Sequence, residues 1–148
     1  MKFLKIFIFI GLLLGMTLSL IAKEIQLPQC DSKSTCVNDK NFYVEVKRVV
    51  RRGDVMIVQL EYTGKSWRQY HFKFFERPFI GNATILDAEG NEFTINGKEI
   101  SNFFLSEKEK KTLSLKFRGD KQKKITEPFD LTIKTRDDEI TLFDLKQM

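Results

Sequence analysis

The feature that most constrains this chain is an alternation of apolar and polar residues that recurs in short segments from residue 42 onward. In the clearest segment, Leu113, Leu115 and Phe117 are separated by single polar residues. Successive side chains of a β-strand point to opposite faces, so this spacing predicts strands with one buried face. Beyond the first 22 residues, no stretch of useful length has the apolar spacing of an amphipathic helix. We therefore expect an all-β protein.

Turn-forming residues separate the predicted strands. Gly53-Asp54 and Asn96-Gly97 are dipeptides typical of tight turns between antiparallel strands. About eight or nine short strands at roughly ten-residue spacing predict an antiparallel sandwich or barrel over residues 41–148. Fourteen phenylalanines in the whole sequence supply bulky side chains for its core. The strands are expected over residues 42–46, 56–62, 83–86, 92–95, 103–105, 113–117, 129–133 and 140–142.

The first 22 residues are typical of a leader and not of the fold itself. Lys2 and Lys5 precede an apolar run from Ile6 to Ile21, and the small residue Ala22 follows it. This pattern indicates a secretory signal peptide cleaved near Ala22, and hence export to the periplasm or the cell exterior. The alternative is a retained N-terminal anchor, although the run is short for a membrane span of about 20 residues. Contact with a membrane is expected only if the apolar run is retained.

Both cysteines, Cys30 and Cys36, lie in the segment of residues 23–40 that precedes the sandwich. In an exported chain, an even number of cysteines predicts a disulfide. The bridge would be local and would pin this segment alone. A redox role is disfavoured because the spacing is not that of a CxxC motif, and two thiols with one distant histidine do not make a metal site.

Charge and composition argue against several classes of function. The net charge of +5 is spread along the chain, unlike the concentrated basic footprint of a nucleic-acid-binding protein. His71 is the only histidine and no GxSxG motif is present, so the sequence does not show the nucleophile and base pattern of a Ser-His hydrolase. We therefore expect a non-catalytic protein with no metal site, no cofactor and no nucleic-acid partner. The lysine-rich residues 119–128 are expected to form a solvated loop.

Three short motifs leave other functions open. Residues 137–139 are three adjacent acids, which fit either a solvated turn or a small extracellular hydrolase with a loop site. An enzyme inhibitor acting through such a loop belongs to the same alternative. Residues 87–92 resemble a calcium loop, but glycine in the fourth place favours a hairpin turn. Residues 52–54 spell Arg-Gly-Asp, the tripeptide that integrins read, and support an adhesin or host-interaction alternative.

The candidate binding site lies in residues 66–75, which hold the only tryptophan and the only histidine. Treated as one strand, this segment sends alternate side chains to opposite faces, one apolar and one largely polar. On the outer face, Trp67, His71 and Lys73 would form an aromatic and cationic patch for a glycan, a peptide or an acidic group. The alternative is that Trp67 covers the sandwich edge and His71 simply faces solvent. The inner set is Arg68, Tyr70, Phe72 and Phe74, and the outer set is Trp67, Gln69, His71, Lys73 and Phe75.

Four segments follow one another along the chain: Leu60–Gly64, Leu86–Phe93, Phe103–Leu105 and Leu113–Phe117. Their order resembles bacterial secreted immunoglobulin-like domains of the DUF4352 type over residues 41–145. A lysine-rich turn at residues 107–110 departs from that pattern, in which a Pro-Gly would be more typical. The resemblance implies an immunoglobulin-like antiparallel β-sandwich and a non-catalytic envelope or accessory domain. We therefore expect binding or structural support, with another envelope protein, a glycan or a peptide as the partner.

Overall fold

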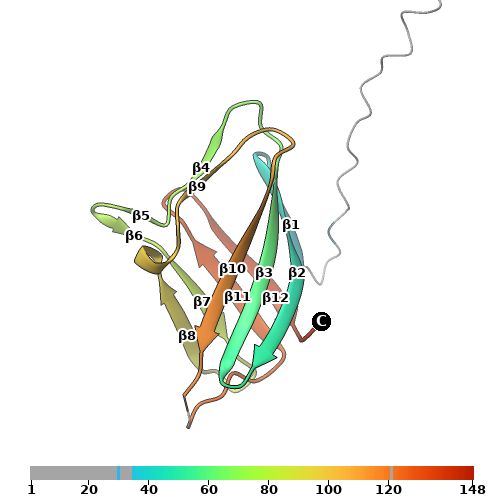
Figure 1. The fold of residues 1–148 in the computed structure, drawn as a ribbon, viewed down its shortest axis with the longest axis vertical. Coiled ribbons are helices and arrows are strands. Elements are labelled where there is room, and N and C mark those ends of the chain that lie inside the picture. The colour runs from blue at the N-terminus through green and yellow to red at the C-terminus, as the bar shows by residue number, and fades with distance from the viewer. Residues whose placement is uncertain (1–29, 31–34, 121) are drawn as a thin grey trace, which may run out of the picture.

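Two four-stranded antiparallel sheets pack face to face in this computed structural model (Figure 1). It describes residue 30 and residues 35–120 and 122–148. A single turn of 3-10 helix is the only helical element in these ranges. The predicted all-β antiparallel sandwich is therefore confirmed, and its two sheets hold eight strands. The predicted signal peptide of residues 1–22 lies outside the described part of the chain.

The first sheet has the strand order β1-β2-β3-β10, with every neighbouring pair antiparallel. Its long β2–β3 hairpin turns at Gly53, as predicted, and the φ of 61° at Gly53 is one that glycine adopts without strain. A β-bulge interrupts the register of β2 between Val46 and Arg48. The strands are β1 (Cys36–Asn38), β2 (Phe42–Arg52), β3 (Val55–Gly64) and β10 (Lys110–Arg118).

The second sheet has the order β12-β11-β7-β8. Residues 87–91 close its β7–β8 hairpin, and Gly90 in this turn has a φ of 81°. The plain hairpin turn predicted for residues 87–92 is thus present. The strands are β7 (Asn82–Leu86), β8 (Glu92–Asn96), β11 (Phe129–Lys134) and β12 (Glu139–Leu145).

The chain visits the two sheets in the order of an immunoglobulin-like sandwich. β2 and β3 lie in the first sheet, β7 and β8 in the second, β10 returns to the first, and β11 and β12 complete the second. Immunoglobulin domains separate their strands A, B and E from strands C, C′, F and G in the same manner. The expected immunoglobulin-like topology is therefore present, with β1 added beside β2 as a short edge strand.

Two short ribbons lie beyond one end of the sandwich (Figure 1). Residues 66–75, expected as one strand, are divided between them, because only residues 70–72 and 75–76 pair with other strands. The 3-10 helix begins directly after Asn96, where the turn was predicted. The ribbons are β4 (Tyr70–Phe72) with β9 (Phe103–Leu105) and β5 (Phe75–Glu76) with β6 (Phe79–Ile80), and the helix is η1 (Gly97–Glu99).

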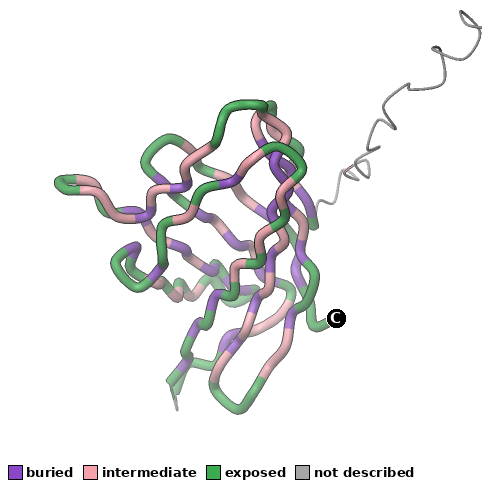
Figure 2. Tube along the Cα trace, turned by 45° about the horizontal axis from the view of Figure 1, so that its top comes forward, coloured by how far each residue is buried: buried purple, intermediate pink, exposed green. Residues whose placement is uncertain are grey.

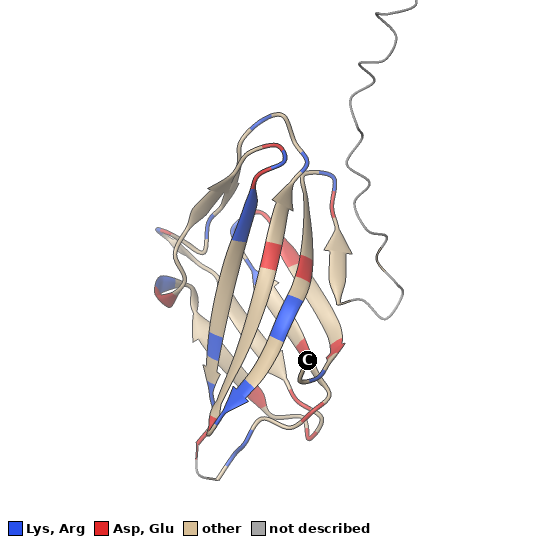
Figure 3. Cartoon of the chain, turned by 45° about the vertical axis from the view of Figure 1, so that its right-hand side comes forward, with Lys and Arg blue, Asp and Glu red and all other residues tan. Residues whose placement is uncertain are grey.

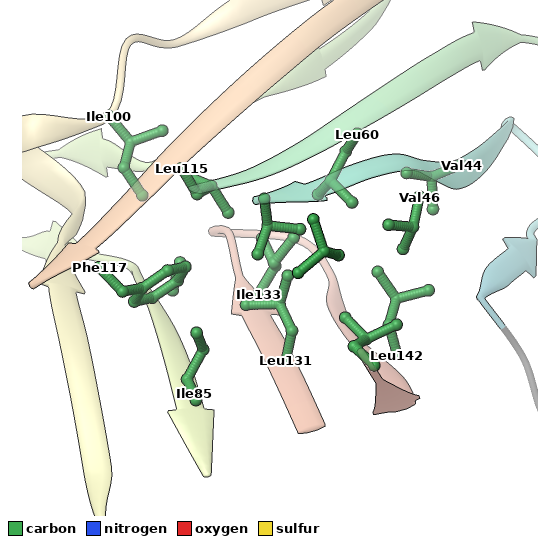
Figure 4. Packing of buried hydrophobic residues seen from close by; sticks show 14 of the residues in the cluster. Val44, Val46, Leu60, Ile85, Ile100, Leu115, Phe117, Leu131, Ile133 and Leu142 are labelled. Atoms are coloured by element: carbon green, nitrogen blue, oxygen red, sulfur yellow. The ribbon is translucent and has the colours of Figure 1, made fainter. Parts of the chain in front are cut away.

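The core fills the space between the inner faces of the sheets, and buried and more exposed positions alternate along the strands (Figure 2). Leu60 and Leu115 of the first sheet pack against the layer that contains Ile133 of the second (Figure 4). Each such side chain contributes about 1.5–3 kcal/mol when it is fully buried. Aromatic rings close the end nearest the ribbons, where Phe72 lies 4.9 Å from Tyr62 between ring centroids.

The loop of residues 119–128 is only partly solvated, which corrects the prediction of a solvated loop. Residues 122–124 are exposed, as expected of a solvated loop, but Ile125 is buried. Nη2 of Arg51 donates a 2.5 Å hydrogen bond to the carbonyl of Ile125, which fixes this part of the loop to β2. The lysines dominated the sequence pattern, and one isoleucine among them gave no periodic signal.

Cys30 and Cys36 form the predicted disulfide, with Cα atoms 5.5 Å apart. This separation is usual for a bridged pair. Cys36 opens β1 and is buried, so the bridge attaches Cys30 to the edge of the first sheet. A disulfide is compatible with an exported protein.

Candidate functional site

The segment that held the predicted binding residues divides as its alternation indicated, but over a shorter length. Phe72 and Phe74 are fully buried and Tyr70 is half-buried, so the inner set is in the core from Tyr70 onward. Arg68, assigned to the same inner face, is exposed. It precedes β4 in a loop, where strand alternation does not apply.

Trp67, His71 and Lys73 occupy different surroundings. Trp67 is 76% exposed, and the guanidinium carbon of Arg68 lies 4.6 Å from the centroid of its ring. His71 instead stacks on Phe104 of β9, with ring centroids 3.9 Å apart. Among the aromatic pairs of the described chain, none joins Trp67 to His71. Trp67 therefore makes no aromatic contact with His71, and a binding role for Trp67, His71 and Lys73 stays a prediction.

The charges around His71 and Lys73 are largely neutralised. Nζ of Lys73 lies 2.8 Å from Oε1 of Glu76, and Arg136 pairs with the same carboxylate. Burial, together with the charge of Lys73, lowers the pKa of His71 below its ordinary value of 6.5. The lowered pKa favours the neutral imidazole, which packs on Phe104 as an aromatic ring.

The acidic cluster of residues 137–139 is tied into a turn. The hydroxyl of Tyr70 donates a 2.5 Å hydrogen bond to Oδ2 of Asp138, while the backbone amide of Asp138 donates to Oγ1 of Thr135. Glu139 pairs with Lys134 at 3.7 Å. Each of these contacts supports the β11–β12 turn, and the geometry gives the cluster a structural role.

Asp87 begins the segment that resembles a calcium loop, but its carboxylate accepts hydrogen bonds from backbone amides. Oδ1 accepts from the amides of Glu89 at 3.0 Å and Asn91 at 2.8 Å, and Oδ2 accepts from the amide of Thr126 at 3.1 Å. Burial alone would raise the pKa of Asp87, but these donors lower it overall. Within the described ranges, no group of three or more His, Cys, Asp or Glu residues could hold a metal ion.

A different surface, on the outer face of the first sheet, gathers cations that the sequence analysis did not single out. The register places three rows across β2, β3 and β10 near the β2–β3 turn. A shallow hollow of about 330 Å³ lies over the first two rows. The rows are Arg48–Gln59–Ser114, Val50–Ile57–Lys116 and Arg52–Val55–Arg118. We call the four cations Arg48, Arg52, Lys116 and Arg118, with the apolar residues Val50 and Ile57 between them, the basic face.

The basic face is uncompensated, whereas the rest of the same sheet surface is neutralised. Further along the sheet, Glu61 is 3.0 Å from Lys110 and 3.6 Å from Lys47, and these cations lower the pKa of its carboxyl. In the described part of the chain, none of the four cations of the basic face makes an ion pair. Figure 3 shows basic segments of β2 and β10 near the β2–β3 turn and acidic segments nearer the middle of the sheet. A further basic segment lies at the far end of β10, where Lys110 pairs with Glu61.

The β-bulge explains why the alternation did not predict this surface. Phe42, Val44 and Val46 face the core, so strict alternation would send Arg48 inward as well. The bulge at Lys47 opposes two residues of β2 to one of β3, which returns Arg48 to the outer face and places Val49 in the core. The sequence signal that could have predicted the basic face is the number of Arg and Lys residues in β2 and β10 near the turn, with no acidic residue among them.

Comparisons with known proteins give a single structural likeness to report. No protein-family model and no curated protein sequence matches the chain. The crystal structure of the YjhA protein from Bacillus subtilis is similar at a TM-score of 0.45 and 13% sequence identity, over 66% of this chain and 76% of that chain. No helix in the described ranges is long and apolar enough to cross a membrane.

Proposed function

We propose that this protein is an exported, non-catalytic β-sandwich that binds an anionic glycan of the cell envelope on its basic face. The observation that carries the proposal is a set of four cations, none of them ion-paired to a described residue, of which Arg48, Arg52 and Lys116 line a hollow together with Val50 and Ile57. Guanidinium groups fit carboxylate, sulfate and phosphate through paired N–H donors. The faces of sugar rings would cover Val50 and Ile57.

The spacing of the cations suits a polymer better than a small anion. Arg48 and Arg52 lie opposite Gln59 and Val55, four residues apart on β3, which is about 14 Å along the strand. Lys116 and Arg118 lie on the opposite side of β3, at about twice the spacing of roughly 4.8 Å between neighbouring strands. A chain with repeated acidic groups would reach several cations at once, and because the hollow is shallow a polymer could lie along it.

The test compares dextran sulfate with uncharged dextran as probes for the purified protein. We expect saturable binding to dextran sulfate alone, weakening steeply with added salt because the contacts are ionic. Arg48→Glu should weaken this binding at least tenfold. Lys40→Glu is the matched control, because it makes the same charge change at an exposed turn at the opposite end of β2 from Arg52. Equal weakening by both variants would mean that net charge, and not the basic face, drives binding.

A second candidate function, adhesion to a receptor that reads Arg-Gly-Asp, is favoured by one observation. Arg52, Gly53 and Asp54 are all exposed at the tip of the β2–β3 hairpin. Asp54→Ala separates the two candidates, because it removes the tripeptide while making the basic face more positive. Loss of cell adhesion with retained dextran sulfate binding would support adhesion. Unchanged adhesion would exclude a role for the tripeptide.

A further inference from the structure

β10 is an edge strand with an open row of backbone groups. It pairs with β3 on one side, and no described strand pairs with it on the other. The amide of Gly64 donates to the carbonyl of Glu109, and the amide of Gly119 donates to the carbonyl of Asp54, both at 2.9 Å. Opposite residues of an antiparallel pair alternate between bonded and non-bonded, so these two bonds fix the pattern between them.

The pattern leaves alternate residues of β10 with unused hydrogen-bonding groups. Residues 111, 113, 115 and 117 direct their amides and carbonyls toward β3. The corresponding groups of Thr112, Ser114 and Lys116 therefore point to the open edge, where an incoming strand could pair with them. Exposed edges of this kind are templates for strand addition.

A groove with both apolar and polar lining residues runs beside this edge. A hollow of about 360 Å³ lies between β10 on one side and β8 with η1 on the other. Figure 1 shows these elements along one flank of the sandwich. Its apolar lining is the half-buried Ile95 and Leu113 with the buried Ile100 and Leu115. Its polar lining includes Ser101, Lys116 and the exposed Glu99. A strand added to β10 would point every second side chain into this groove, because successive residues alternate between faces.

The other side chains of an added strand would meet the basic side of β10. The exposed residues of β10 include Lys116 and Arg118, which belong to the basic face, and Lys110, which pairs with Glu61. Acidic residues directly opposite these cations would be favoured, and basic ones disfavoured. A second copy of this chain is a poor occupant, since pairing β10 with β10 brings like charges together.

We propose that β10 accepts an extended acidic peptide by strand addition, with acidic side chains beside Lys116 and Arg118 and apolar side chains in the groove of Ile95, Ile100 and Leu113. The added strand would extend the first sheet to five strands by pairing with the fourth. Backbone hydrogen bonds would supply affinity, and the alternation of acidic and apolar residues would supply specificity. This site shares Lys116 and Arg118 with the basic face, but it adds the backbone edge of β10 and does not use Arg48 or Arg52 of β2.

The test uses the acetylated, amidated peptide Glu-Val-Glu-Val-Glu-Val-Glu and amide hydrogen exchange read by NMR. We expect saturable binding that slows exchange at Thr112, Ser114 and Lys116 at least tenfold. A peptide with lysine in place of glutamate should bind at least tenfold more weakly. Protection centred on another part of the surface, or no saturable binding, would overturn the proposal. So would self-association of this protein that protects the same amides without peptide.

Two backbone changes test the strand pairing itself. Thr112→Pro removes an open-edge amide and leaves the β3 ladder intact, since proline is tolerated where the strand N–H faces away from its partner. It should weaken peptide binding at least tenfold. If this variant does not fold, the wild-type protein is tested with a peptide N-methylated at alternate residues, prepared in both registers. At least one register must lose binding, and equal binding by all three peptides would contradict strand addition.

The same variants separate this site from the proposed glycan site. Arg48→Glu lies on β2 and should leave peptide binding within about twofold while it weakens dextran sulfate binding. Thr112→Pro, at a residue outside the hollow of the basic face, should do the reverse. Loss of both activities in both variants would contradict two distinct sites and would point to one shared surface.

Discussion

The hydroxyl of Tyr70 donates a 2.5 Å hydrogen bond to Oδ2 of Asp138, which joins β4 to the turn between β11 and β12. Burial raises the pKa of Asp138 above 3.8, although the bond from Tyr70 acts in the opposite direction. Because the folded-state pKa lies above the unfolded one, the carboxylate of Asp138 reduces stability as pH rises through the folded-state value. The hydrogen bond from Tyr70 stabilises the carboxylate of Asp138 and so reduces this loss of stability.

Tyr70→Phe should therefore reduce the free energy of unfolding in a pH-dependent manner. We expect a loss of about 1–3 kcal/mol at pH 7, where the variant leaves a partly buried carboxylate without this donor. At pH 3 the loss should be smaller, because Asp138 is then largely protonated. Urea unfolding at both pH values measures the difference. Tyr43→Phe is the control, since its hydroxyl lies 3.4 Å from Glu45. Equal losses at both pH values would contradict a role for the Asp138 charge.

Asp87 should make the opposite contribution to the pH dependence. Its carboxylate accepts from three backbone amides, and burial raises its pKa while the bonds from Asn91 and Thr126 lower it overall below 3.8. A lowered folded-state pKa contributes stability that is present above the unfolded pKa and is lost as pH falls through the folded-state value. Asp87→Asn should cost about 1.5–3 kcal/mol at pH 7.

Thermal unfolding of this variant between pH 2 and pH 7 provides the measurement. The wild-type protein should lose stability below about pH 4 more steeply than Asp87→Asn, because the variant lacks the titrating group. Glu89→Gln, in the same turn but exposed, is the control and should follow the wild-type curve. Parallel curves for Asp87→Asn and the wild type would show that the carboxylate does not titrate with folding.

Trp67 and Phe72 should respond in opposite ways to truncation, although both belong to one aromatic-rich segment. Trp67 is 76% exposed, so Trp67→Ala should change the free energy of unfolding by less than about 0.5 kcal/mol. Phe72 is 1% exposed among other rings, and Phe72→Ala should cost about 3–5 kcal/mol. Chemical denaturation of both variants decides between these roles. An unfolded Trp67→Ala variant would place that side chain in the core.

The alternation of side chains predicted most of the fold because one face of each long strand is buried. It identified the strands around Leu60, Leu115 and Ile133 and separated Phe72 from His71. It could not show which strands pair, since pairing depends on residues far apart in the chain. The stacking of His71 on Phe104 joins segments 33 residues apart and left no local pattern. The basic face was hidden for another reason, because a bulge changes the phase of the alternation within a strand.

The bulge itself gives the last prediction. Lys47 is the extra residue of β2, and its only ion-pair partners in the described chain are Glu45 and Glu61. Deletion of Lys47 would leave Val46 facing inward, Arg48 outward and Val49 inward, so the core and the basic face would both keep their positions. We expect a stability loss below about 1 kcal/mol, because exposed ion pairs contribute little, and unchanged binding of dextran sulfate.

Deletion of Gln59 is the matched comparison, because Gln59 lies opposite the bulge on β3 and has no extra residue beside it. Removing it would shift the register by one, so that core residues on one side of the deletion turn outward. That variant should not fold, as judged by loss of the cooperative unfolding transition and of dispersed amide resonances. A protein that loses its fold on deletion of Lys47, or keeps it on deletion of Gln59, would show that the bulge does not set which side chains reach the basic face.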